Sequence, residues 1–466
     1  LSVTIDDDVQ IMQDAALSIV EPNLADGTVT TSTVDVMPNQ SADGATITQF
    51  TYDGVVNTLD PSVSGEQPFS FTEGELFITL EGEMRFEPNR DLDHSASEDI
   101  VKSIVVTSSD FDNDVVTSTV TLTITDGDVP TIDSVPSVSL SETHLADGSA
   151  PSGSAVSSTQ TITYTNQSDD VVNFRIEPTE FNTGGALTSN GLAVELKADP
   201  TTPGGYLGFV TDGSNVETNV FTISFSETNL GQYTFTLLEA LDHADGLINN
   251  DVSFDVPVYA VDSDGDDSLM SPLSVTIDDD VQIMQDAALS IVEPSLADLV
   301  AGTPTTPTID VIPTQSADGA KVTQFIYDGG TAVTLDPNVS TEQVFTVTDG
   351  LLYITIEGEV RFEPNRNLDH SAGDIVRTIV VTISDFDRDT DTADVTLTIQ
   401  DGIDPVIDVV PSVNLSEVNL ADGSTPSGSA VSSTQTITYT VGSDDLSHFR
   451  IATNEFNPGD VLKSNG

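Results

Sequence analysis

Three short stretches in which aspartate occupies every second position are the residues of this sequence best placed to do chemistry. They lie at 110–114, 262–266 and 385–389, and each has little basic charge nearby to neutralise its carboxylates. Oxygen donors at this density favour a hard divalent cation, and the chain has no cysteine that would indicate a thiolate metal site. The pattern therefore predicts structural Ca²⁺ sites rather than a catalytic centre.

Four acidic features recur in the same order along the chain: an early glutamate, a Leu-Asp-His tripeptide, the aspartate stretch and a set of junction acids. In a sandwich of about seven strands, the early glutamate and the junction acids can lie at one pole, with the aspartate stretch at the other. Two successive modules would then share the roughly six to eight oxygens that Ca²⁺ takes. The candidate ligands are Glu21, Glu142, Glu293, Asp93, Asp242, Asp369, Asp110, Asp112, Asp262, Asp264, Asp385, Asp387, Asp6, Asp8, Asp126, Asp128, Asp278, Asp280, Asp401 and Asp404.

Internal repeats set the domain organisation. Residues 1–22 recur without change at 273–294, and residues 145–165 recur at 420–440 with one change, Ala150 to Thr425. Two module types, A and B, therefore alternate. We predict the terminal strand of a preceding module at 1–8, module one (type A) at 9–127, module two (type B) at 128–279, module three (type A) at 280–402 and a truncated module four (type B) at 403–466.

The hydrophobic period within the modules is two. Val116, Val120, Leu122 and Ile124 share one face of a segment whose other face is threonine, as a half-buried strand requires. Residues 81–83 form a tight turn between two such segments, and helical periodicity is nearly absent. The fold class predicted is all-β, with tandem immunoglobulin-like or cadherin-like antiparallel β-sandwich modules in a linear array.

The composition of the chain limits the partners that it can bind. The 466 residues carry 77 acidic and 12 basic side chains, a formal net charge of −65 that repels nucleic acid and anionic membranes. No apolar run has transmembrane length, and the chain reads as an excerpt of a longer protein. We expect a monomeric array whose partners are adjacent modules of the same chain, joined through calcium. In a low-calcium cytosol repulsion would keep the chain loose, and millimolar extracellular Ca²⁺ would drive folding.

The order of these acidic features resembles cadherin repeats, in which an early glutamate, a Leu-Asp dipeptide, a D-x-D and an acidic linker hold junction calcium. A second resemblance covers essentially the whole chain. The Leu-Ala-Asp-Gly motifs at 145–148 and 420–423, the Leu-Asp-His at 241–243 and the Asp-Ser-Asp-Gly-Asp at 262–266 are similar to those of long bacterial adhesins. That resemblance implies extender repeats of an RTX-type adhesin, type I secreted to the bacterial cell surface, which project a distal ligand-binding domain in cell adhesion and biofilm formation.

Other interpretations of these motifs are weaker. An EF-hand loop starting at Asp262 would need Gly and Glu where the chain has Asp267 and Leu273. His94, His243 and His370 could bind zinc, but no second His or Cys accompanies them, which favours a structural hydrogen bond. Leu-Ala-Asp-Gly favours a turn over a ligand.

Two other functions compete with the role of an extender, or spacer, region. The repeats could bind a glycan or host protein weakly and multivalently, although a chain without Trp and with eight Tyr offers few aromatic platforms. Catalysis has no support, because the sequence has no nucleophile triad, no phosphate-binding glycine loop and no H-E-x-x-H. We predict that the chain is not an enzyme.

Overall fold

The computed structural model describes the chain except for residues 1, 5, 7, 27–31, 96–98, 154, 245–249, 303–305, 387, 430, 454 and 456–466. The chain divides into two compact units, and each is described by itself. The first unit comprises Leu1–Ala146, Pro151–His243 and Asn250–Asp279, and the second comprises Asp147–Ala150, Ala244–Asn249 and Asp280–Gly466. No helix of the described residues is long and apolar enough to cross a membrane.

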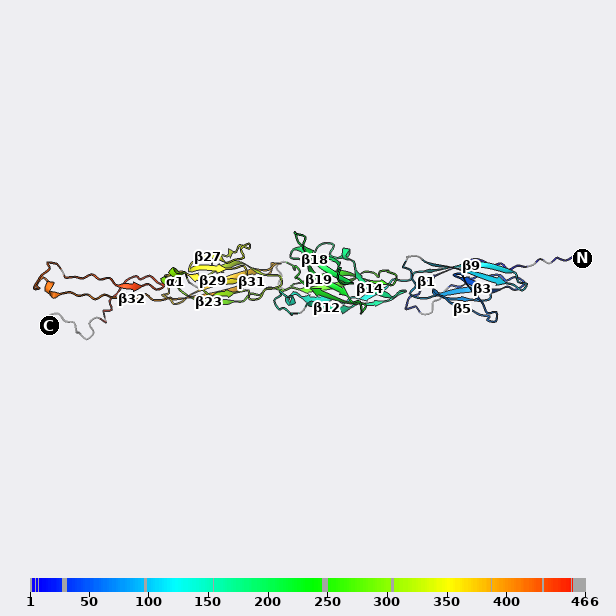
Figure 1. Cartoon of the computed structure of the whole chain (residues 1–466), viewed down its shortest axis with the longest axis horizontal. Helices are drawn as coiled ribbons and strands as arrows, with labels where there is room; N and C mark the ends of the chain where they lie inside the picture. Colours follow the sequence, from blue (N-terminus) through cyan, green and yellow to red (C-terminus); the bar gives the residue numbers. More distant parts are fainter. Residues whose placement is uncertain are drawn as a thin grey trace. The chain divides into compact units, whose positions relative to one another are not determined.

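Module one is a sandwich of two sheets (Figure 1). All neighbouring strands pair antiparallel except β1 and β9, which run parallel, so that the first strand closes the edge beside the last. The five-stranded sheet has the order β1 (Ala15–Val20), β9 (Val115–Thr125), β8 (Ile100–Ser109), β3 (Thr46–Tyr52) and β4 (Val55–Thr58), and the four-stranded sheet has the order β2 (Val34–Asp35), β7 (Glu83–Pro88), β6 (Gly74–Ile78) and β5 (Gln67–Ser70).

Module three, in the second unit, repeats this strand order, as its similar sequence predicts. Its parallel pair joins β23 to β31. The five-stranded sheet contains β23 (Ala287–Val292), β31 (Thr390–Gln400), β30 (Ile375–Ser384), β25 (Lys321–Tyr327) and β26 (Val333–Thr334), and the four-stranded sheet contains β24 (Thr308–Asp310), β29 (Glu359–Pro364), β28 (Gly350–Ile354) and β27 (Gln343–Val347).

Module two has the same plan with more strands. Its sheets have the orders β11-β22-β21-β14 and β12-β20-β19-β18-β17, and β11 pairs parallel to β22. The bounds are β11 (Val138–Ser141), β22 (Ser271–Asp278), β21 (Asp251–Asp262), β14 (Val171–Ile176), β12 (Val156–Thr161), β20 (Gln232–Leu237), β19 (Glu217–Phe225), β18 (Gly205–Thr211) and β17 (Glu195–Ala198). Small ribbons of module two pair β10 (Thr131–Ser134) with β13 (Thr163–Thr165) and β15 (Thr188–Ser189) with β16 (Leu192–Ala193). In module four, in the second unit, β32 (Val406–Val409) pairs with β33 (Thr438–Thr440).

Helical structure in the described residues is limited to three 3₁₀ turns and one short α-helix. The 3₁₀ turns are η1 (Glu142–His144), η2 (Pro178–Glu180) and η3 (Glu417–Asn419). The α-helix α1 (Leu296–Ala301) begins with a capping box between Ser295 and Asp298 and ends at Gly302, whose φ is 66°. The Leu-Ala-Asp-Leu segment of module three thus forms the first turn of a helix, in which Asp298 completes the capping box.

The core of each sandwich follows the period-two pattern. Val120, Leu122 and Ile124 of β9 are fully buried, whereas the intervening threonines lie at or near the surface. Phe50 and Phe86, one from each sheet, are fully buried between them. The predicted fold class, all-β tandem sandwich modules with mainly antiparallel strands, is confirmed.

Strand direction determines which loops meet at each end of a module. Val20 and Thr125, the last residues of β1 and β9, pair side by side, so the segments that follow them leave module one at the same end. The β8–β9 turn at 110–114 lies at the opposite end, since β8 and β9 are antiparallel. We call the first end the base and the second the tip, and we use these names for the corresponding ends of the other modules.

Candidate metal sites at the module bases

A buried glutamate marks the base of each complete module. In β1, Leu17 and Ile19 face the core, and Glu21 occupies the next inward position just beyond the strand, so its side chain is buried. Its Oε1 accepts a hydrogen bond of 2.8 Å from the backbone N–H of Leu92, and its Oε2 lies 3.5 Å from Nε2 of His94. The same arrangement recurs at Glu142 with Leu241 and His243, and at Glu293 with Leu368 and His370.

In the first unit, the base of module one gathers carboxylates from two modules. Oxygens of Glu21, Asp126 and Asp169 lie within 4.8 Å of one another, although Asp169 belongs to module two. Three further acids from the tip of module two interact electrostatically with this group. We call the six residues the junction cluster: Glu21, Asp126, Asp169, Asp262, Asp264 and Asp266.

Burial and mutual repulsion raise the proton affinity of the junction cluster. The pKa of Glu21 is raised to about 7, mainly by burial and further by the charges of Asp169 and Asp126. Burial, together with the charges of Asp264, Asp262 and Asp126, raises the pKa of Asp169 to about 6. Burial also raises the pKa of Asp126. Without a metal, the negative charge of these carboxylates is therefore poorly compensated at neutral pH.

Direct hydrogen bonds hold the tip of module two against the base of module one. The backbone N–H of His94 donates to Asp264 at 2.9 Å, and the hydroxyl of Ser263 donates to Asp91 at 2.9 Å. Arg90 forms an ion pair with Asp170. The acidic stretch of one module therefore lies beside the Leu-Asp-His loop of its neighbour.

Gly127 allows the backbones of the two modules to approach closely. A Cβ built at this position would lie 2.4 Å from Cβ of Ser168 and 2.9 Å from the carbonyl oxygen of Glu21. Gly402 meets the same obstruction in the second unit, where Ser443 lies 2.5 Å away. Glycine is thus required at both junctions because any side chain would overlap backbone or Cβ atoms.

We expect Gly127→Ala to destabilise the junction by about 1–3 kcal/mol, the usual cost of overpacking. Limited proteolysis at residues 126–130 and thermal unfolding measure the effect. Gly65→Ala is the matched control, because a Cβ added at that position would meet no other atom within 4 Å. Equal behaviour of the two variants would contradict a close-packed junction.

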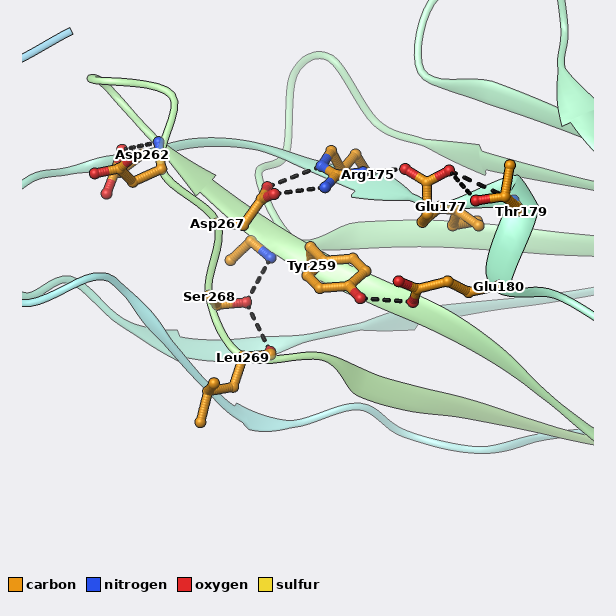
Figure 2. A network of polar contacts seen from close by, with 12 residues as sticks. Arg175, Glu177, Thr179, Glu180, Tyr259, Asp262, Asp267, Ser268 and Leu269 are labelled. Carbon is orange, nitrogen blue, oxygen red and sulfur yellow. Dashed lines mark hydrogen bonds and ion pairs between the residues drawn. The ribbon is translucent and has the colours of Figure 1, made fainter. Parts of the chain in front are cut away.

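A polar network secures the acidic loop of module two just beyond the junction cluster (Figure 2). Arg175 on β14 donates from Nε to Asp267 at 2.8 Å and also pairs with Glu177. The Ser268 hydroxyl accepts the backbone N–H of Ala260 at 2.9 Å. Asp262 closes the loop itself, since its Oδ1 accepts from the backbone N–H groups of Asp264, Gly265 and Asp266. The loop is therefore held at both ends by the sandwich.

The structure brings together only part of the predicted ligand set. Glu21, Glu142, Glu293, Asp126, Asp401, Asp262 and Asp264 lie in or beside clusters at module bases. Asp110, Asp112 and Asp114 form a group at the tip of module one, where Asp110 also accepts the backbone N–H of Asp114. Asp385 accepts that of Asp389 at 2.7 Å, and Asp387 lies outside the described residues.

The aspartates of the Leu-Asp-His tripeptides do not join these clusters, contrary to our expectation. Asp93 and Asp369 are exposed and accept the backbone N–H two residues on, from Ser95 and Ser371. Asp242 accepts from the backbone N–H of Gly191 at 2.8 Å. The following histidine, rather than the aspartate, lies beside the buried glutamate.

Most of the remaining junction aspartates also lie outside the clusters. Asp8 and Asp280 occupy equivalent positions and accept the backbone N–H of Ala42 and Ala317. Burial raises the pKa of Asp278, and the charge of Asp251, which pairs with it across the ladder, raises it further. Asp128 accepts from Asn23, and Asp6 and Asp404 are exposed.

Sequence reasoning missed several residues that the structure places in the clusters. Asp169 belongs to a Ser-Asp-Asp tripeptide that recurs at 443–445, so the repeat carried a signal for it. Asp279 lies within 4.8 Å of Glu142 and His243, whereas only its neighbours Asp278 and Asp280 were predicted. Asp266 is the last aspartate of its stretch.

The junction cluster fits Ca²⁺ on the chemistry of its donors. Oε2 of Glu21 and Oδ1 of Asp169 are buried and accept no hydrogen bond from the described residues. Buried oxygens without donors are costly, and a hard cation that binds several carboxylates compensates them. Glu21, Asp126, Asp169, Asp262, Asp264 and Asp266 would hold the ion, with oxygens from both modules.

Fold and site together define a tandem β-sandwich repeat protein with acidic junctions. No family model and no curated protein sequence match the chain. Among solved structures, it is similar to Drosophila N-cadherin EC1-3 (13% identity, 83% of this chain, 98% of that chain, TM-score 0.24) and mouse cadherin-23 EC22-24 (13%, 83%, 96%, 0.26). Protocadherin gamma B2 domains 3-6 also match (14%, 87%, 76%, 0.26).

Proposed function

We propose that this chain is a calcium-stiffened spacer from an extracellular adhesion protein. One observation carries the proposal: in the junction cluster, carboxylates of two successive modules (Glu21, Asp126 and Asp169) lie within 4.8 Å of one another, and three more from module two interact with them electrostatically. Bound Ca²⁺ would supply the positive charge that lets these carboxylates stay ionised and close together. Each module would then be joined to the next module of the same chain through the shared ion.

The chain's own residues explain why such a joint would resist bending. Glu21 and Asp126 follow the two outermost paired strands of module one, and Asp262 is the last residue of β21 in module two. Each carboxylate is therefore attached to a sheet rather than to a flexible tether. The linker between β9 and β10 is only five residues long, from Asp126 to Pro130, and Gly127 packs against Ser168.

The finer assignment, an extender region of a type I-secreted bacterial surface adhesin, is supported by the repeated Leu-Ala-Asp-Gly and Leu-Asp-His motifs. In that role length matters more than surface recognition, because near-identical tandem copies offer no unique binding site. The net charge of −65 suits a chain that folds only on reaching millimolar calcium.

Small-angle scattering of the whole chain in Ca²⁺ and in EGTA tests the spacer function. We expect a smaller spread of interdomain angles in Ca²⁺. After chelation, the distance distribution should broaden or its maximum dimension should fall. Mg²⁺ at the same ionic strength is the control for simple screening, because it prefers small octahedral sites with retained water. Identical profiles in Ca²⁺ and EGTA would overturn the proposal.

A further inference from the structure

The imidazoles at the module bases add a nitrogen donor to sites that otherwise contain only oxygen. At the base of module three, the side chains of Glu293 and His370 are 0% and 4% exposed. Oε1 of Glu293 accepts the backbone N–H of Leu368 at 3.0 Å. Its Oε2 and both ring nitrogens of His370 make no hydrogen bond within the described residues. Three buried polar atoms thus need a partner.

The spacing between these atoms suits two ligands of one ion. Nε2 of His370 and Oε2 of Glu293 are 3.4 Å apart, an ion-pair distance when the imidazole is protonated, and they make no hydrogen bond with each other. Two donors that bind the same tetrahedral zinc at about 2.0–2.1 Å are roughly 3.3 Å apart. The third residue, Asp401, has an oxygen within 4.8 Å of a ligand atom of each of the other two residues and is exposed, which leaves a path for an ion from solvent.

The same three residue types meet at the base of module two. Glu142, His243 and Asp279 are all buried, their donor atoms lie within 4.8 Å of one another, and the Glu–His distance is again 3.4 Å. This recurrence in a module of the other type, where Asp279 follows the last strand as Asp401 does, indicates a property of the base rather than of one loop.

We propose that Glu293, His370 and Asp401, and likewise Glu142, His243 and Asp279, bind a divalent transition metal of the Zn²⁺ class. Ca²⁺ takes oxygen ligands, whereas imidazole favours zinc and its neighbours. Three protein ligands and one water complete a four-coordinate site. Glu293 and Asp401 are also candidate Ca²⁺ ligands, so the two ions would compete for them, and the imidazole, which calcium does not use, favours the transition metal.

Co²⁺ titration of the whole chain in saturating Ca²⁺ tests the proposal, with four-coordinate d–d absorption as the readout. We expect His370→Gln to remove one Co²⁺ equivalent and Zn²⁺ to displace the ion, while excess Ca²⁺ does not. His144→Gln is the matched control, since His144 is exposed and hydrogen bonds to Thr143. Unchanged absorption in His370→Gln, or displacement by Ca²⁺, would overturn the inference.

Asp401→Asn is a second variant that keeps the test valid if His370→Gln misfolds. Asp401 is exposed, so its substitution should not disturb the fold. We expect this variant to fold as the parent does and to lose roughly 100-fold or more in Co²⁺ affinity at one site, at least the loss caused by removing outer-shell support. Parental Co²⁺ affinity in Asp401→Asn would refute the three-ligand site. Loss of calcium stiffening with Co²⁺ binding intact would refute the spacer function alone.

Discussion

Chelation of calcium is expected to lower the melting temperature of the whole chain by about 10 °C or more. A site filled at 100 times its Kd stabilises the folded state by about 2.7 kcal/mol. In domains of about 100–150 residues, each kcal/mol corresponds to roughly 3–6 °C. The loss is large here because chelation also leaves the six carboxylates of the junction cluster facing one another.

Asp169→Asn locates this effect at the junction cluster. Asp169 is 2% exposed and is surrounded by the charges of Asp264, Asp262 and Asp126. We expect the variant to lose much of its stabilisation by Ca²⁺ but to be at least as stable as the parent in EGTA, since it removes one repelling charge. Glu195→Gln, an exposed acid on β17, controls for net charge. Calorimetry showing the parental calcium response in Asp169→Asn would contradict the assignment.

The pH dependence of stability should change sign with calcium. In EGTA the folded protein holds protons on Glu21 and Asp169 more tightly than the unfolded chain, because their pKa values are raised from 4.5 to about 7 and from 3.8 to about 6. Stability from these groups is fully present below pH 4 and is lost as the pH rises to 7. Glu21 alone accounts for about 3 kcal/mol at 1.36 kcal/mol per pKa unit.

In saturating Ca²⁺ the trend should reverse over the same range, because the ion binds the ionised carboxylates and competes with protons. Urea unfolding at pH 5, 6, 7 and 8 measures both trends. Glu21→Gln keeps an oxygen to accept the Leu92 N–H and should flatten the EGTA profile. His94, Asp126 and Asp169 face Glu21 and contribute to the residual slope. Parallel profiles with and without calcium would rule out that protons and the metal bind the same carboxylates.

The fold could be predicted from the sequence because the signals for it are local and repeated. The alternation in β9 predicted which face is buried, and the identity of 1–22 with 273–294 predicted two modules of the same type. The parallel pairing of β1 with β9 carried no local signal, because it joins strands about a hundred residues apart in sequence. That pairing decides which loops meet at the base.

The early glutamates were also predictable, since Glu21 continues the inward phase of β1. Sequence alone could not show that Asp93 caps its own turn while His94 faces Glu21, because adjacent residues of a loop have no fixed period. It likewise could not place Asp169 beside Glu21, which requires two modules to be folded and in contact.

The sequence by itself determined the residue types, hence the preference for a hard cation, the module repeat and the inward-facing strand positions. Tertiary structure decided which carboxylates share a site. The physical reason is that an aspartate has two competing uses, to cap a local backbone N–H or to converge with distant carboxylates. Only the packing of base against tip settles which use Asp93, Asp169 and Asp264 each serve.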